Sequence, residues 1–184
     1  MKTKKNIILT GAQGTGKTTV LKLFSQAHPE YSTITEVVRN LAKTDKVSVN
    51  ENGDIASQRK IFSTYCNLLS QNGFISDRGL TDVMSYTDWV ADEKTDDADG
   101  MAMGFEFVRE EKILRDYNNT HDVLYVYFPI EFSVEDDGFR STSESFRRSI
   151  DKRIKHILEK NKIKYITVHG TPEERLKQIE DALS

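Results

Sequence analysis

Short apolar runs alternate with helical patterns along the chain. The runs that predict buried strands lie at residues 6–10, 33–37, 73–76, 123–128 and 163–168. Between these runs, apolar residues recur three or four positions apart, which is the spacing of one face of an α-helix. The alternation is typical of βαβ units. It predicts an α/β fold in which five mainly parallel strands form a sheet with helices on both faces, a three-layer sandwich.

Capping and turn signals indicate where some of these helices begin and end. The helix after the first strand carries Val20, Phe24 and Ala27 on one face and ends before Pro29. Residues 171–174 read Thr-Pro-Glu-Glu, a capping box that coincides with proline at the first helical position. Residues 93–100 are acidic and unpatterned, which predicts an exposed loop.

The composition limits the kinds of molecule that the protein is expected to bind and the compartment in which we expect it. The net charge is −3 over 184 residues, so no overall basic field attracts nucleic acid or a membrane surface. Cys66 is the single cysteine, which excludes an internal disulfide and favours a reducing compartment. The apolar run at residues 7–9 is too short for an export signal, and no stretch approaches the roughly 20 apolar residues of a membrane span. We therefore expect a cytoplasmic protein, monomeric or homodimeric, that folds as one domain over residues 1–184.

A glycine-rich motif lies between the first predicted strand and the helix that follows it. Residues 11–18, GAQGTGKT, fit the pattern G-x-x-x-x-G-K-[ST] at every position. Its glycines let backbone N–H groups turn toward phosphate oxygens, and the helix adds its positive N-terminal end. Lys17 can reach the β and γ phosphates, and the hydroxyl of Thr18 can ligate Mg²⁺. The motif predicts a P-loop for ATP and Mg²⁺ formed by Gly11, Gln13, Gly14, Thr15, Gly16, Lys17, Thr18 and Thr19.

Charged side chains follow the second and third predicted strands. Glu36 ends the second strand, and Arg39 comes one helical turn later. Asp77 ends the third strand, with Arg78 beside it. Because ligands of parallel α/β sheets bind at the carboxyl edge, these four residues predict the site of the phosphoryl acceptor. Asp77 could also face Mg²⁺ or its water, as phosphoryl transfer requires. The alternatives are a structural role for Asp77 at the end of its strand and, for Glu36 and Arg39, an ion pair on the surface.

A cluster of arginines follows a glycine in the last third of the chain. Gly138 precedes Arg140 and Arg147, which are seven residues apart. A glycine-hinged segment that carries arginines could close over the triphosphate and bring positive charge to the γ-phosphoryl group. We predict such a lid at residues 136–148. The alternative is a basic, solvated start of a helix.

Five segments of the sequence together resemble a known family. They are GAQGTGKTTVLKLF (11–24), TEVVRN (35–40), ISDRGLTDVMSY (75–86), DDGFRSTSESFR (136–147) and VHGTPEERL (168–176). Their order and spacing resemble the small P-loop kinases of nucleosides and nucleotides. The closest resemblance is to the NadR-like AAA-type kinase domains, which include ribosylnicotinamide kinase domains and phage-encoded relatives.

The resemblance implies further features of the site. It implies that Asp82 and Tyr86 line the acceptor site together with Glu36, Arg39, Asp77 and Arg78, and that Thr171 and Pro172 border the adenine. Gly79 departs from the pattern. Thymidylate kinases have an aromatic residue or histidine after Asp-Arg, and deoxynucleoside kinases usually have serine, so neither substrate class is favoured.

These observations predict transfer of the γ-phosphoryl group of ATP to a nucleoside or a nucleoside monophosphate. Lys17 and Thr18 would hold the triphosphate and Mg²⁺, Glu36 or Asp77 would orient the acceptor, and Arg140 and Arg147 would close over it. One alternative is a kinase of 5′-hydroxyl nucleic-acid ends, which the acidic balance disfavours. A second is a binding protein that hydrolyses ATP slowly and signals through a partner.

Overall fold

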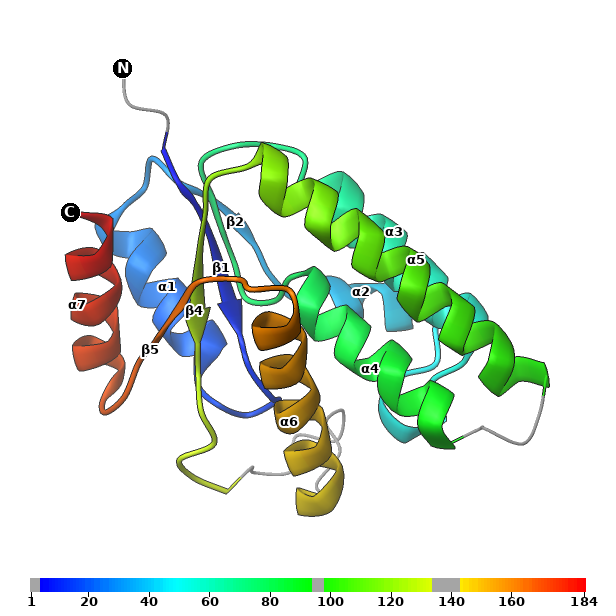
Figure 1. Cartoon of the computed structure of the whole chain (residues 1–184). Helices are drawn as coiled ribbons and strands as arrows, with labels where there is room; N and C mark the ends of the chain where they lie inside the picture. The colour runs from blue at the N-terminus through cyan, green and yellow to red at the C-terminus, as the bar shows by residue number, and fades with distance from the viewer. Residues whose placement is uncertain (1–3, 94–97, 134–142) are drawn as a thin grey trace.

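The computed structural model describes residues 4–93, 98–133 and 143–184. It contains one sheet of five parallel strands in the order β2-β3-β1-β4-β5, which confirms the predicted fold class (Figure 1). The strands are β1 (Asn6–Thr10), β2 (Ser32–Ile34), β3 (Phe74–Ser76), β4 (Val123–Tyr127) and β5 (Tyr165–Thr167). Because β1 lies between β3 and β4, the segments that leave these strands at their carboxyl ends are brought side by side.

The helices agree with the apolar pattern in most places. They are α1 (Lys17–Ala27), α2 (Val37–Thr44), the 3₁₀ turn η1 (Asn50–Asn52), α3 (Ile55–Leu68), α4 (Leu80–Glu93), α5 (Ala98–Thr120), α6 (Glu144–Lys160) and α7 (Pro172–Leu183). The capping box predicted for α7 is confirmed, with the Thr171 hydroxyl accepting from Glu174 N and the Glu174 carboxylate accepting from Thr171 N. No helix in the described ranges is long and apolar enough to cross a membrane.

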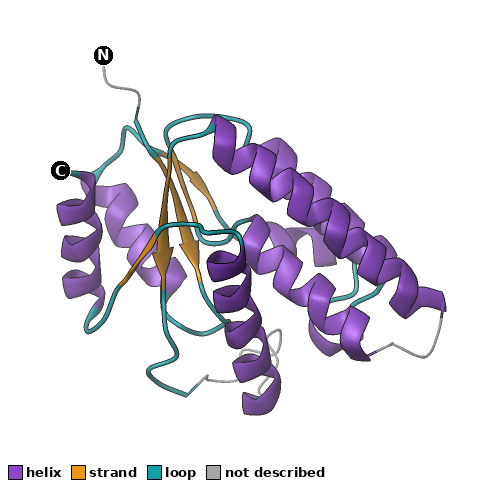
Figure 2. Cartoon of the chain, in the orientation of Figure 1, coloured by secondary structure: helices purple, strands orange, loops and turns teal. Residues whose placement is uncertain are grey.

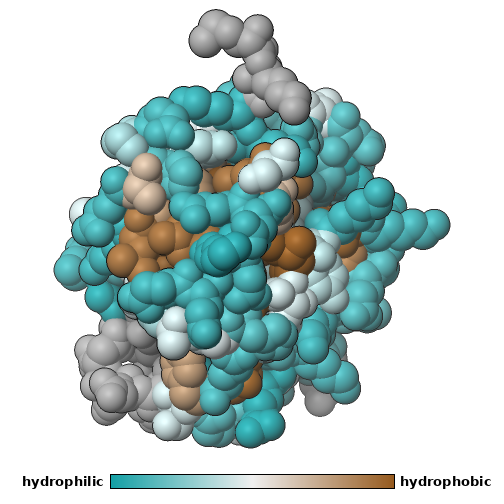
Figure 3. Space-filling view, turned by 90° about the vertical axis from the view of Figure 1, so that its left-hand side faces the viewer, coloured by the Kyte–Doolittle hydropathy of each residue, from teal (hydrophilic) through white to brown (hydrophobic). Residues whose placement is uncertain are grey.

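Helices cover both faces of the sheet, as Figure 2 shows. Successive strand residues point to opposite faces, so Ile7 and Leu9 of β1 pack with α1 and α7, whereas Ile8 packs with the helices of the opposite layer. That opposite layer contains α3, α4, α5 and α6, and it is the larger of the two cores. Seen from the side of α7, the surface is mainly hydrophilic, with hydrophobic groups visible in the hollows between polar ones (Figure 3).

The largest differences from the predicted boundaries are at the end of β2 and in the acidic segment. Strand β2 ends at Ile34 rather than at residue 37, because Glu36 adopts a left-handed backbone with φ of 57° and α2 begins at Val37. The acidic segment 93–100 is not wholly a loop, since α5 already begins at Ala98, while residues 94–97 lie outside the described residues.

The long helix α5 has no counterpart among the predicted elements, and its burial pattern explains why. Its face toward the core buries Glu106, Glu110 and Glu111, whereas Phe105 and Val108 are exposed by 74% and 64%. Met103 and Leu114 are buried on the same face, so these charged and exposed apolar residues interrupt the apolar periodicity that identifies an amphipathic helix. The helix is nevertheless held by α4, against which Leu114 and its neighbours pack.

The buried carboxyl of Glu110 predicts a pH-dependent stability. Its Oε1 accepts from the Thr87 hydroxyl at 3.3 Å, and its Oε2 has no hydrogen-bond partner in the described structure. Burial raises the pKa of Glu110 from 4.5 to about 8, although the Thr87 hydrogen bond opposes the rise. Between these values the unfolded chain binds fewer protons than the folded one, so the free energy of unfolding falls as pH rises, by up to about 1.4 kcal/mol per pH unit.

The substitution Glu110→Gln keeps the size of the side chain and removes its titration. We expect the variant to lose less stability than the parent between about pH 5 and pH 8. Urea unfolding of both proteins across this range measures the difference. An equal slope of stability against pH in the two proteins would show that Glu110 does not carry the effect.

Candidate functional site

The P-loop has a backbone that depends on its glycines. Gly11, Gly14 and Gly16 have φ of 142°, 67° and 89°, in the region that L side chains rarely adopt. At Gly11 a Cβ would also lie 2.4 Å from the carbonyl oxygen of Phe128. Gly16 caps helix α1, so the loop ends at the positive end of that helix. The sequence motif therefore forms the strand–loop–helix geometry that phosphate binding requires.

Lys17 lies inside the loop and is 6% exposed. Its Nζ donates to the carbonyl oxygens of Gly11 at 2.6 Å and Ala12 at 2.7 Å, and to the Thr15 hydroxyl at 3.2 Å. The ammonium group is thus held at the mouth of the anion-binding loop by neutral oxygens. Phosphate oxygens are stronger partners for the same group, because both members of such a pair are charged.

Asp77 brings an acid to the first turn of α1. It directly follows β3, which is the neighbour of β1 in the sheet, so its carboxylate reaches the P-loop helix. Its Oδ2 accepts from the Thr18 hydroxyl at 3.1 Å and from the Thr35 hydroxyl at 2.9 Å. A hydroxyl and a carboxylate are oxygen donors of the kind that Mg²⁺ prefers, and the predicted metal residues Thr18 and Asp77 therefore meet. In the described structure no group of three or more His, Cys, Asp or Glu side chains could hold a metal by itself, so phosphate oxygens and water would complete the shell.

A cavity that is partly open to solvent extends from the P-loop to helices α2, α3 and α4. Its loop wall is formed by residues 13–19. Five of the six residues predicted for the acceptor site lie in its other walls, namely Glu36, Arg39, Asp77, Arg78 and Tyr86. The cavity thus joins the expected nucleotide site to the expected acceptor site.

Glu36 stands at the carboxyl end of β2 in a strained conformation. Its φ of 57° is unusual for a residue with a long side chain, and such strain gathers at functional sites. The Glu36 Oε2 lies 3.2 Å from the Arg39 Nε, one turn into α2. Both side chains are about one-third exposed, so the pair faces the open cavity rather than the core.

Arg78 and Tyr86 form a second polar wall. The Arg78 Nη1 donates to the Tyr86 hydroxyl at 3.4 Å, and the guanidinium lies 5.7 Å from the centre of the tyrosine ring. Tyr86 in turn donates to Gln13 Oε1 at 3.1 Å, which links this wall to the P-loop. Among the described residues, no carboxylate forms an ion pair with Arg78. The guanidinium is therefore available to an anionic group of a ligand.

Asp82 was expected in the acceptor site, but it lies beneath the P-loop, outside the cavity lining. The side chain is fully buried and accepts from Gly11 N at 3.3 Å and Gly79 N at 3.0 Å. Burial raises the pKa of Asp82, although Lys17 and Arg78 oppose the rise. Asp82 therefore holds the turn between β3 and α4 against the start of the P-loop.

Packing explains why position 79 is a glycine, whatever the class of substrate. A Cβ at this position would lie 2.6 Å from Cγ2 of Ile8, in the middle of strand β1. The turn after β3 approaches the central strand too closely for any side chain. The departure from the kinase pattern at Gly79 is thus explained by packing.

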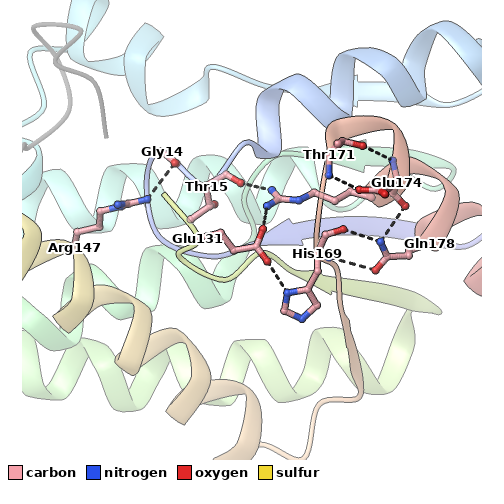
Figure 4. A network of polar contacts seen from close by, with 9 residues as sticks. Gly14, Thr15, Glu131, Arg147, His169, Thr171, Glu174 and Gln178 are labelled. Carbon is pink, nitrogen blue, oxygen red and sulfur yellow. Dashed lines mark hydrogen bonds and ion pairs between the residues drawn. The ribbon is translucent and has the colours of Figure 1, made fainter. Parts of the chain in front are cut away.

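The remaining predicted residues lie outside the cavity lining or outside the described residues. Thr171 is the N-cap of α7 and Pro172 its first residue, and neither lines the cavity; Figure 4 shows Thr171 beside Glu174 at the start of that helix. Arg147 is 1% exposed, and its guanidinium binds the outer face of the loop. Arg140 and the lid residues 136–142 lie outside the described residues.

Helices α2, α3 and α4, together with the start of the turn η1, supply a part of the cavity wall that sequence reasoning missed. This part is mainly apolar and consists of Val37, Val38, Val49, Asn50, Gln58, Ile61, Tyr65 and Val83. Gln58, Ile61 and Tyr65 share one face of α3. Gln58 and Tyr65 are only 3% and 0% exposed, so their polar groups are buried. A signal was present in the sequence, since a glutamine at a core position of a helix is unusual unless it is hydrogen-bonded.

Comparison with known proteins identifies a family and a set of similar folds. A family model described as an AAA domain matches residues 6–175. A search of curated proteins found no match. The chain is similar to a NadR protein in complex with NR (16% identity, TM-score 0.70, 97% of this chain and 51% of that chain), so it spans about half of that protein.

Two further solved structures cover nearly their whole length. The deoxyadenosine kinase from M. mycoides with bound dCTP is 15% identical, with a TM-score of 0.65 over 97% of this chain and 98% of that chain. The shikimate kinase from Aquifex aeolicus is 20% identical, with a TM-score of 0.55 over 97% of this chain and 95% of that chain. At these identities the similarity shows the fold, which is shared by kinases of nucleotides and of other small molecules.

Proposed function

The chain belongs to this family of AAA domains, and from that premise we propose that it is an ATP-dependent kinase of a nucleoside or a nucleoside monophosphate. The observation that supports the proposal most strongly is the continuous cavity. Its walls hold Lys17 and the Thr18–Asp77 pair, and they also hold Glu36, Arg78 and the other groups that would bind the acceptor. A binding module for ATP alone has no need of this second set of groups.

The chemistry follows from the positions of these groups. The P-loop amides and Lys17 would hold the β and γ phosphates, and Thr18 and Asp77 would hold Mg²⁺, which supplies neutralisation of the phosphate charge. Glu36 would accept a hydrogen bond or a proton from the attacking hydroxyl, and Arg78 would hold an anionic oxygen of the acceptor. The bond from the acceptor oxygen to the γ-phosphorus forms while the bond to the β–γ bridging oxygen breaks, and ADP leaves. Arg140, named from the sequence, remains a proposal for the closing step, whereas Arg147 binds the outer face of the P-loop and does not line the cavity.

The part of the cavity that is lined by α3 and α4 favours an acceptor with a planar ring. Its walls are apolar side chains, among them Ile61 and Val83, which suit the faces of a heterocycle. Two polar groups lie among them, the amide of Gln58 and the hydroxyl of Tyr65, and the Tyr65 hydroxyl has no hydrogen-bond partner in the described structure. A buried hydroxyl without a partner is costly, and the edge of a nucleobase offers donors and acceptors both to this hydroxyl and to the amide of Gln58. A polyhydroxylated acid would instead leave the apolar walls facing hydroxyls.

Replacing Gln58 with leucine tests this assignment. The two side chains are similar in size, so we expect the cavity to keep its shape and lose the hydrogen bonds to the ring. The acceptor KM should rise by about 10- to 100-fold while the KM for ATP changes little. Steady-state kinetics with the best acceptor gives both constants. The matched control is Gln26→Leu, a substitution at an exposed position of α1, and equal acceptor KM values in the two variants would remove Gln58 from the site.

A panel of acceptors tests the proposed function itself. ADP formation is measured with nucleosides, nucleoside monophosphates, shikimate, a 5′-hydroxyl oligonucleotide and no acceptor. The proposal predicts stimulation by a nucleoside or a monophosphate above all others. Stimulation by the oligonucleotide would indicate an end-specific polynucleotide kinase, and ATP hydrolysis that is indifferent to every acceptor would indicate a nucleotide-dependent binding protein.

A further inference from the structure

Two buried arginines hold the outside of the P-loop, and we infer that Arg147 and Arg175 are positioning residues that shape the loop for the triphosphate. The inference rests on the proposed function only in that the loop must bind a polyphosphate. Neither residue lines the cavity. Arg175 comes from α7 and Arg147 from α6, so the two lie far from the P-loop in sequence (Figures 1 and 4).

The two side chains bind three consecutive carbonyl oxygens of the loop. Arg147 donates from Nε to Gln13 O at 2.8 Å and from Nη2 to Gly14 O at 3.1 Å. Arg175 donates from Nη1 to Thr15 O at 2.6 Å. In Figure 4 the labelled Arg147 reaches Gly14, while the bond to the Thr15 carbonyl comes from the opposite side.

The direction of these carbonyls determines the direction of the phosphate-binding amides. In a planar trans peptide, the C=O of one residue and the N–H of the next point in opposite directions. Carbonyls 13, 14 and 15 that point outward to the arginines therefore direct the N–H groups of Gly14, Thr15 and Gly16 away from the arginines, toward the inside of the loop. These three residues line the cavity, so the inside of the loop is where phosphate would bind. Successive amides that point into one hollow form an anion-binding nest.

Each guanidinium is oriented by contacts of its own. The Arg147 Nη1 donates to Phe132 O at 2.7 Å and to Glu144 Oε1 at 3.0 Å. Arg175 pairs with Glu131, and its guanidinium lies 5.4 Å and 5.8 Å from the ring centres of Phe128 and Phe132. Since Arg147 and Arg175 are only 1% and 2% exposed, both charges are shielded from water and their forks have one orientation.

Glu131, which pairs with Arg175, is itself held in place and so helps to orient the Arg175 guanidinium. The Glu131 Oε1 interacts with His169 Nδ1 at 2.6 Å, while its Oε2 holds Arg175. The hydrogen bond from His169 is the main cause that lowers the pKa of Glu131, and Arg175 adds to it. Glu131 is thus charged under ordinary conditions. A lysine at either arginine position could supply a positive charge but not the planar fork that serves several acceptors at once.

The test separates loop geometry from general stability by measuring anion affinity. The variants are Arg147→Met, Arg175→Met and the two conservative variants with lysine. The probes are Mg·ATP and inorganic tripolyphosphate, with dissociation constants from calorimetry of variants that circular dichroism shows to be folded. We expect each Met variant to weaken both ligands by a similar factor of about 10- to 100-fold, and each Lys variant to fall between Met and the parent. Arg153→Met is the matched control, because Arg153 is an arginine of α6 that pairs with Asp88 and Asp92.

The outcomes distinguish the inference from the proposed function. If the parent itself fails to bind tripolyphosphate and ATP, the proposed function fails. If the parent binds and the folded Arg147 and Arg175 variants bind as tightly, the positioning role is excluded. Weaker binding of Mg·ATP together with parental binding of tripolyphosphate would also overturn the inference, since the arginines would then act on the nucleoside part of ATP. If a Met variant does not fold, the corresponding Lys variant is used in its place. Parental affinity of that Lys variant for both ligands would exclude a role that needs the planar guanidinium.

Discussion

Replacing Lys17 with alanine is expected to abolish detectable turnover and to weaken the binding of Mg·ATP sharply. The ammonium group lies inside the P-loop, 2.6 Å and 2.7 Å from two loop carbonyls, where the β and γ phosphates would bind. Its removal deletes charge-assisted hydrogen bonds to oxygens whose charge changes during transfer. Loss of such a group in a shielded site lowers the rate by about 100- to 1000-fold or more. Steady-state rates and calorimetric titration with Mg·ATP measure the two effects.

The control for Lys17 is Lys22→Ala, an exposed lysine of the same helix. This variant should keep the parental rate and affinity. If Lys17→Ala binds and consumes ATP as the parent does, the assignment of residues 11–18 as the nucleotide-binding loop is wrong.

The second large effect is expected for Glu36→Gln. The glutamine keeps the shape of the side chain and removes both its charge and its ability to accept a proton. Because Glu36 lines the same cavity as the P-loop and its Oε2 lies 3.2 Å from the Arg39 Nε, it can act on the attacking hydroxyl of an acceptor. We expect kcat to fall by at least about 100-fold, the low end of general-base assistance, with little change in the affinity for ATP.

Two comparisons interpret the result for Glu36. Glu30→Gln, at an exposed position before β2, should leave kcat unchanged. Parental kcat in Glu36→Gln would remove Glu36 from the chemistry and leave Asp77, the other carboxylate of the cavity, as the residue that orients the acceptor.

The parts of the site that could be predicted from the sequence are those carried by contiguous segments. The P-loop is one such segment, and its glycines and Lys17 have the geometry that the motif implies. Asp77 and Glu36 could be placed because parallel strands deliver their following residues to one edge of the sheet. The meeting of Thr18 with Asp77, at 3.1 Å, needed only that β1 and β3 be neighbours.

The other parts depend on contacts between distant segments, which no local pattern records. Asp82 follows the Asp-Arg segment in sequence, yet the first turn of α4 directs it beneath Gly11 rather than into the cavity. Gln58 and Tyr65 reach the cavity only because α3 packs on α4. Arg175 is 160 residues from Thr15, the residue whose carbonyl it binds. Such roles follow from packing, which a single sequence does not reveal.

The most direct test of the account follows the γ-phosphoryl group itself. ATP labelled in that group is incubated with Mg²⁺, the protein and the most effective nucleoside or nucleoside monophosphate of the acceptor panel, and the labelled products are separated. We expect the label to appear in the phosphorylated acceptor, one equivalent for each ADP formed, and we expect Lys17→Ala to abolish this product. Label found only in inorganic phosphate, released at the same rate with and without the acceptor, would contradict the proposed transfer.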